Sequence, residues 1–180
     1  MANLLTAIRL LLVIPVAWSM ADEQLMPGLA TLALIGLAIA TDYFDGIVAR
    51  ATGTASPRGM LFDHSTDFLF VTLGLTGAAM AGLTHWLLPL LIVLAFTQYV
   101  LDSYFLFRDK QLRMSFLGRW NGVLYFVPII GIALARSASN QTVIDTLLFI
   151  VQGLAWILMT STVASIVDRG LAPFRQRGTP

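Results

Sequence analysis

The sequence contains no cysteine and little charge. Without cysteine, the 180-residue chain forms no disulfide framework, no thiolate zinc site and no cysteine nucleophile. Any metal must therefore be held by oxygen atoms or by the two histidines. Charged residues make up 12% of the chain and apolar residues 57%, whereas about a quarter of the residues in an average soluble domain are charged. This composition predicts a protein that is embedded in lipid.

Six apolar runs follow one another along the chain. They cover residues 4–20, 27–49, 60–83, 86–107, 117–136 and 142–167, and each is near or above the roughly 17 to 25 residues that a helix needs to cross the hydrocarbon layer. The first run has no basic leader and no cleavage signature, so we interpret it as a retained helix rather than a signal peptide. We predict a single all-α domain over residues 1–180 with six transmembrane helices.

The basic residues are distributed unevenly between the two sides of this predicted bundle. If the N-terminus lies inside, only Arg136 of the eleven basic residues falls on the outer side, where Asp22 and Glu23 also lie. By the positive-inside rule, both termini are then cytoplasmic. We expect a multi-pass protein of the inner membrane if the source is bacterial. The formal net charge of +1 gives no indication of a nucleic-acid partner, and we expect none.

Two pairs of carboxylates interrupt the second and third apolar runs. Asp42 and Asp45 are three residues apart near the end of one predicted helix, and Asp63 and Asp67 are four residues apart near the start of the next. Each spacing places both side chains on one helix face. Helices joined by a short loop are antiparallel neighbours, so we expect the two pairs to converge at one depth.

Four clustered carboxylates inside apolar segments require positive charge close by. No lysine and only two arginines, Arg50 and Arg58, accompany them in the sequence, which disfavours a structural salt-bridge network. Oxygen ligands without sulfur favour Mg²⁺ or Mn²⁺, and carboxylates that bridge two ions suit phosphoryl transfer. A proton or divalent-cation pathway is the alternative, although its acidic groups would be spread through the membrane rather than clustered.

The segment from Asp42 to Asp67 also carries a specific motif. It matches D-x2-D-G-x2-A-R-x8-G-x3-D-x3-D at every specified position, and it resembles the signature of the CDP-alcohol phosphatidyltransferase family. The resemblance implies a six-helix membrane enzyme that transfers a phosphatidyl group from a CDP-activated lipid, such as CDP-diacylglycerol, to an alcohol and releases CMP.

The same resemblance implies roles for individual residues. Two ions, Mg²⁺ or Mn²⁺, would share Asp42 and Asp63, while Asp45 would bind the first ion and Asp67 the second. Asp67 would also be the general base. The residues that match positions lining the CDP moiety are Gly46, Ala49, Arg50 and Gly59, with Ser56 a weaker match beside the diphosphate.

The first apolar run begins with a second, less specific motif. Asn3, Thr6 and Arg9 are similar to the family's Asn-x2-Thr-x2-Arg segment, which borders the nucleotide site. The alternative is that Asn3 and Thr6 cap a helix while Arg9 extends to the lipid headgroups. The sequence leaves both interpretations open.

The acceptor alcohol is not specified by the motif. The candidate acceptor residues are Asp102, Arg113 and Arg119. Arg119 also fits a topology anchor, and Asp102 also fits a hydrogen bond between helices, for example with Tyr99. The lysines and the Arg-Glu pair that glycerol-phosphate enzymes of the family usually carry are missing, which argues against that acceptor. We expect a small polar alcohol or its phosphate, with a lipid alcohol such as phosphatidylglycerol as the next option.

Two other functional classes compete with the enzyme hypothesis. One is a divalent-cation transporter, and the other is an inactive lipid-binding protein of the same fold, against which the intact Asp67 argues. Homodimers are common in the family that the motif resembles, so we also expect a homodimer surrounded by membrane lipids.

Overall fold

The computed structural model describes residues 2–53, 56–102 and 116–176, and every regular element within these ranges is a helix. The prediction of an all-α fold is therefore confirmed for the described part of the chain. The helices are α1 (Ala2–Ala21), α2 (Gly28–Ala51), α3 (Pro57–Met80), α4 (Leu87–Leu101), α5 (Phe116–Leu124), α6 (Phe126–Ser137) and α7 (Gln141–Gln176).

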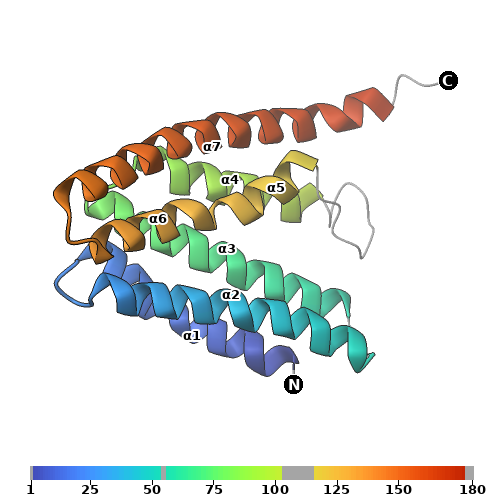
Figure 1. Cartoon of the computed structure of the whole chain (residues 1–180). Helices are drawn as coiled ribbons and strands as arrows, with labels where there is room; N and C mark the ends of the chain where they lie inside the picture. The colour runs from blue at the N-terminus through green and yellow to red at the C-terminus, as the bar shows by residue number, and fades with distance from the viewer. Residues whose placement is uncertain (1, 54–55, 103–115, 177–180) are drawn as a thin grey trace.

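The helices lie side by side and form an elongated bundle (Figure 1). Both chain termini lie at one end of the bundle, together with the connection between α2 and α3. The turns that join α1 to α2, α3 to α4 and α6 to α7 lie at the opposite end. This arrangement places the N-terminal parts of α1 and α3 beside the C-terminal part of α2.

Only some of the described helices are long and apolar enough to cross a bilayer by themselves. Among the described residues, three segments meet this condition, Gly28–Val48, Leu117–Ser137 and Gln141–Leu171, while Leu5–Ala21 and Leu87–Leu101 are shorter apolar helices. Together with the low charge of the chain, these segments indicate an integral membrane protein. A helix is present in each of the six predicted runs.

The fifth apolar run is divided where we expected one continuous helix. Helix α5 ends at Leu124, and α6 begins at Phe126 after Tyr125. Pro128 explains the break, because proline has no amide hydrogen to donate to the carbonyl of Leu124 and its ring clashes with that carbonyl. Tyr125 still donates a hydrogen bond of 2.9 Å to the carbonyl of Asn121, so α5 and α6 follow one another as the single apolar segment Leu117–Ser137.

Helix α1 packs closely against α3, and glycine makes this packing possible. A Cβ atom added to Gly77 of α3 would lie 2.3 Å from the carbonyl oxygen of Ala17 in α1. Val16 and Met20 of α1 and Leu75 of α3 are almost completely buried in the same apolar core. The close approach brings the polar N-terminal part of α1 against the carboxylates of α3.

At the opposite end, the C-terminus of α1 is capped by a side chain from α6. Arg136 donates one hydrogen bond to the carbonyl oxygen of Ser19 and another, 3.1 Å long, to that of Met20. Its Nε atom lies 4.0 Å from a carboxylate oxygen of Glu23. Carbonyls at the end of a helix have no partner inside it, so these contacts stabilise the end of α1.

Candidate active site

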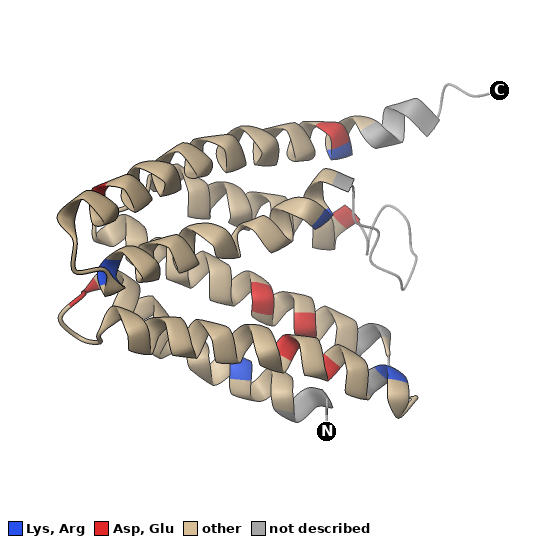
Figure 2. Ribbon diagram, viewed as in Figure 1, with Lys and Arg blue, Asp and Glu red and all other residues tan. Residues whose placement is uncertain are grey.

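The four predicted aspartates come from two neighbouring helices, α2 and α3 (Figure 2). Asp42 and Asp45 lie on α2, and Asp63 and Asp67 lie on α3. The two pairs converge, because one guanidinium group, that of Arg9, contacts Asp42 on α2 as well as Asp63 and Asp67 on α3. The two pairs therefore come together in the structure, as the sequence predicted.

The positive charge at this cluster comes from α1, which our sequence analysis did not predict. Arg9 donates hydrogen bonds to Oδ1 of Asp42 and Oδ1 of Asp63, and its Nη1 atom lies 2.9 Å from Oδ1 of Asp67. Its side chain is only 1% exposed, so the interpretation that Arg9 extends to the headgroups is wrong. The sequence did contain a signal: an arginine within an apolar helix is expected to have a partner.

Thr6 extends the contact of α1 to the fourth aspartate. Its hydroxyl donates a hydrogen bond to Oδ2 of Asp45, and both residues are buried. Thr6 and Arg9 are three residues apart and share one helix face. All four aspartates are therefore in contact with α1, and one arginine is set against four carboxylates.

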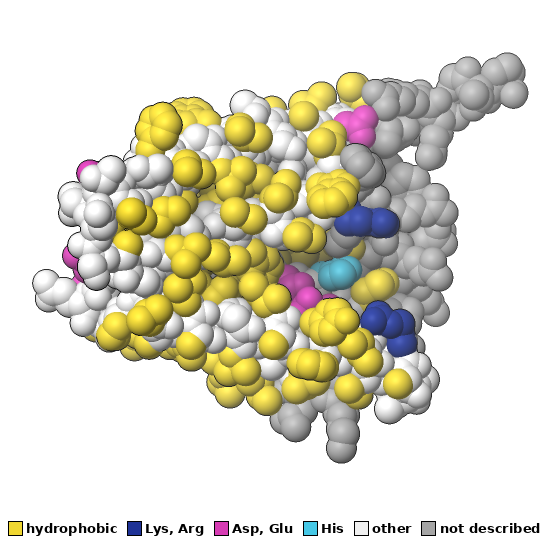
Figure 3. All heavy atoms as spheres, in the orientation of Figure 1, with side chains coloured by type: hydrophobic (Ala, Val, Ile, Leu, Met, Phe, Trp, Pro, Cys, Tyr) yellow, Lys and Arg dark blue, Asp and Glu magenta, His cyan; other side chains and the backbone are white. Residues whose placement is uncertain are grey.

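A cavity of about 510 Å³ opens beside the cluster. Its charged and titratable lining consists of Asp42, His64 and Asp67 together with Arg119 of α5 and Arg169 of α7. The remaining lining is largely apolar and aromatic and includes Val71, Ile92, Phe96, Phe126, Val127 and Ile130. Figure 3 shows acidic side chains and a histidine in a hollow of an otherwise largely hydrophobic face.

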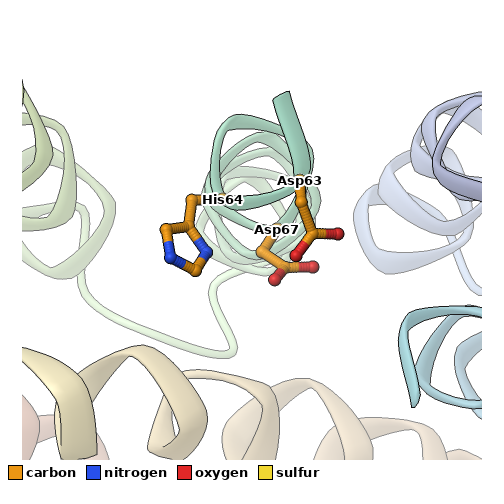
Figure 4. Close-up of side chains that lie close together, drawn as sticks. All are labelled: Asp63, His64 and Asp67. Atoms are coloured by element: carbon orange, nitrogen blue, oxygen red, sulfur yellow. The ribbon is translucent and has the colours of Figure 1, made fainter. Parts of the chain in front are cut away.

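His64 also lies close to two of these aspartates. One ligand atom from each of Asp63, His64 and Asp67 lies within 4.8 Å of the others, and Figure 4 shows the three side chains together on α3. The carboxylates fit a divalent ion, because the group offers oxygen ligands and no sulfur, which is the donor set that Mg²⁺ and Mn²⁺ prefer.

The residues predicted to bind the CDP donor surround the ends of α2 and α3. Nη1 of Arg50 lies 3.3 Å from the position of a Cβ atom added to Gly46, so this guanidinium group lies over Gly46. Ser56 is the N-cap of α3, and its Oγ atom accepts a hydrogen bond of 3.1 Å from the amide of Gly59. The side chains of Asn3 and Ala49 lie outside the described part of the structure.

The predicted acceptor residues are separated by the structure. Arg119 lines the cavity, whereas Arg113 lies outside the described residues. Asp102, at the end of α4, lies 3.8 Å from Nη1 of Arg169. The guanidinium group of Arg169 also lies over the ring of Tyr99, 5.1 Å from its centroid. Arg169 is a candidate functional residue that we had interpreted only as a topology charge.

Comparison with known proteins agrees with this geometry. The profile of the family described as CDP-alcohol phosphatidyltransferase matches residues 1–167. The chain belongs to this family. Members are transferases of substituted phosphate groups that move a phosphatidyl group from a CDP-alcohol to an acceptor, and they use divalent metal ions. The match covers the carboxylate cluster, α1 and most of α7, so the chain is a membrane enzyme of this class. No curated protein and no solved structure matched in the same comparisons.

Proposed function

We propose that this enzyme transfers the phosphatidyl group of CDP-diacylglycerol to a small polar alcohol or its phosphate and releases CMP. The observation that carries the proposal is the shared cavity, which is lined by Asp42 and Asp67 as well as by the two arginines Arg119 and Arg169. A cavity lined by apolar groups and by opposite charges suits a reaction between an amphipathic donor and a polar acceptor.

Asp42, Asp45, Asp63 and Asp67 are the residues that would hold the ions. This donor set consists of carboxylate oxygens, the ligands that Mg²⁺ and Mn²⁺ prefer, with His64 as a further candidate. When bound, two such ions would screen the negative charge of the diphosphate and of the carboxylates. Arg9 supplies only one of the positive charges that four carboxylates require.

Asp67 is the residue that we assign to proton transfer. Its carboxylate lines the cavity, so an acceptor hydroxyl bound there comes within reach of it. The hydroxyl oxygen forms a bond to the phosphorus atom of the phosphatidyl group as its proton passes to Asp67. The bond between that phosphorus atom and the oxygen of CMP breaks, and CMP leaves with the electron pair.

The donor is expected to lie at the loop end of α2 and α3. Arg50 is exposed there and offers a planar guanidinium group to a diphosphate. The lack of a side chain at Gly46 lets the Arg50 guanidinium lie over α2, and the lack of one at Gly59 leaves room for the Ser56 hydroxyl. Because Ser56 only accepts a hydrogen bond from Gly59, its hydroxyl hydrogen remains available for a phosphate oxygen. Asn3, Ala49 and Thr6 complete the predicted donor site.

Two features of the cavity favour different acceptors. The arginines Arg119 and Arg169 favour an acceptor that carries a phosphate group. The apolar lining around Val127 and Ile130 favours a lipid alcohol such as phosphatidylglycerol as the second candidate. Asp102, which faces Arg169, then orients this guanidinium group rather than contacting the acceptor.

The membrane arrangement of the proposed enzyme follows from its charges. We infer six crossings, with both termini and the carboxylate cluster on the cytoplasmic side. Labelling of single cysteines introduced at the two ends of the bundle tests this arrangement, because the chain has no native cysteine. Homodimerisation stays a prediction, which light scattering of the detergent-solubilised protein would check.

CMP release by the purified enzyme tests the function. The assay supplies CDP-diacylglycerol, Mg²⁺ or Mn²⁺ and a panel of acceptors that includes polar alcohols, their phosphates and phosphatidylglycerol. We expect release with one acceptor, loss of release in Asp67→Asn and normal release in Asp145→Asn, which makes the same chemical change at an exposed position on α7. No release from the wild-type protein with any acceptor would contradict the proposed donor, and metal transport without a CDP-lipid would support the transporter alternative.

A further inference from the structure

Arg9 is placed behind the carboxylates as seen from the cavity. It is 1% exposed, whereas the side chains of Asp42, Asp63 and Asp67 are 44%, 30% and 29% exposed. Arg9 does not line the cavity, but Asp42 and Asp67 do. The guanidinium group therefore contacts the carboxylates without lining the space that a ligand would enter.

The contacts of Arg9 involve one oxygen atom of each carboxylate. They join its two Nη atoms to Oδ1 of Asp42, Asp63 and Asp67. Among the described residues, no hydrogen bond reaches the Oδ2 atom of any of the three. Oδ1 of Asp67 is itself buried, so the exposure of this side chain comes from its other atoms. One oxygen of each carboxylate is directed toward Arg9, and the other remains available.

We propose that Arg9 is a positioning residue for the divalent ions. It fixes the Oδ1 atoms of Asp42, Asp63 and Asp67 from the α1 side and keeps their Oδ2 atoms free for metal binding. A planar guanidinium group suits this role, because its donors have a fixed geometry that a lysine ammonium group lacks. The inference rests on the metal site of the proposed function and on no assumption about the donor or the acceptor.

The alternative is that Arg9 occupies the place of an ion and must leave before metal binds. The two possibilities predict opposite effects of removing it. A positioning residue raises metal affinity, and loss of a group that orients metal ligands typically lowers the affinity about 10- to 100-fold. A competing cation lowers metal affinity, so its removal would make metal binding tighter.

Titration of the solubilised protein with Mn²⁺ separates these possibilities. The electron paramagnetic resonance signal of the free ion measures how much Mn²⁺ remains unbound. We expect Arg9→Gln to bind Mn²⁺ about 10- to 100-fold more weakly than the wild-type protein. Arg9→Lys keeps the charge but not the planar geometry, and we expect it to remain weaker than wild type. Arg136→Gln is the matched control, because Arg136 is also largely buried and also binds α1, but at the end remote from the carboxylates.

The outcomes are distinct. Tighter binding or unchanged binding in Arg9→Gln would overturn the positioning role, and so would full wild-type affinity in Arg9→Lys. An equal loss of affinity in the Arg136→Gln control would also overturn it, since the effect would then follow from loosening α1 in general. A wild-type protein that binds no Mn²⁺ would overturn the proposed metal site itself, a result that none of the other outcomes produces.

Discussion

Replacement of Gly77 by alanine tests whether the contact between α1 and α3 holds the active site together. The added methyl group would lie 2.3 Å from the carbonyl oxygen of Ala17 and 3.1 Å from both the amide nitrogen of Ala21 and Cβ of Met20. A backbone carbonyl cannot rotate away, so the two helices must separate by about 1 Å to restore ordinary van der Waals contact. Overpacking of this kind typically costs about 1–3 kcal/mol.

Thermal unfolding in detergent, followed by circular dichroism, measures this cost. For a chain of this size, each kcal/mol shifts the midpoint by about 2–4 °C, so we expect Gly77→Ala to melt roughly 2–12 °C below wild type. Gly36→Ala and Gly153→Ala are the controls, because an added Cβ would meet nothing within 4 Å at either position. These controls should melt at or above the wild-type temperature, since alanine favours the helix by up to about 1 kcal/mol.

The same variant tests whether the packing of α1 against α3 affects metal binding, since α1 carries Arg9 and Thr6. If α1 moves away from α3, their contacts with the carboxylates weaken, and we expect the affinity for Mn²⁺ to fall together with the melting temperature. If Gly77→Ala has the same melting temperature as the Gly36→Ala control, the reasoning about the close contact is refuted. A destabilised variant with wild-type Mn²⁺ affinity would instead show that the carboxylates do not depend on the position of α1.

Further predictions concern other parts of the bundle. Gly28→Ala should destabilise the protein by about 1–3 kcal/mol in thermal unfolding, because its Cβ would lie 2.7 Å from the backbone of Arg136. Tyr125→Phe should cost about 0.5–1.5 kcal/mol in the same assay, since it removes the buried 2.7 Å hydrogen bond to Thr162. Ser56→Ala removes the N-cap of α3 and should cost about 0.5–2 kcal/mol, together with weaker binding of CDP-diacylglycerol in an equilibrium assay. Addition of a chelator should abolish CMP release and lower the melting temperature, because an ion present at 100 times its Kd stabilises the folded state by about 2.7 kcal/mol.

The sequence predicted the helices and the carboxylate pairs well, because both depend on the spacing of residues that are close together in the chain. The spacing of Asp42 and Asp45 and of Asp63 and Asp67 fixes a shared helix face, and the short loop between α2 and α3 makes these helices antiparallel neighbours. The break at Tyr125 was missed, although Pro128 three residues later is a local signal for it.

The partners of the carboxylates could not be derived in the same way. The contact of Arg9 with α3 depends on how α1 lies against α3, and a close approach of the two helices occurs at Gly77. No periodicity in the sequence reveals that contact. Arg169 was missed for a related reason: α7 continues as a helix beyond the apolar run that ends at residue 167, and its guanidinium group lies over Tyr99 of α4. The sequence suggested an acceptor role or a hydrogen bond between helices for Asp102, and its carboxylate lies 3.8 Å from Nη1 of Arg169.

The contact between Arg136 and the end of α1 joins the first helix to a residue that is synthesised much later. The cluster that contains Arg9 needs only the chain up to Asp67, whereas the carbonyls of Ser19 and Met20 gain their side-chain partner only when residue 136 has been made. During translation, the catalytic end of the bundle can therefore assemble before the opposite end is closed. A nascent chain that ends between these two points contains all four aspartates but still lacks the side chain that caps the last turn of α1.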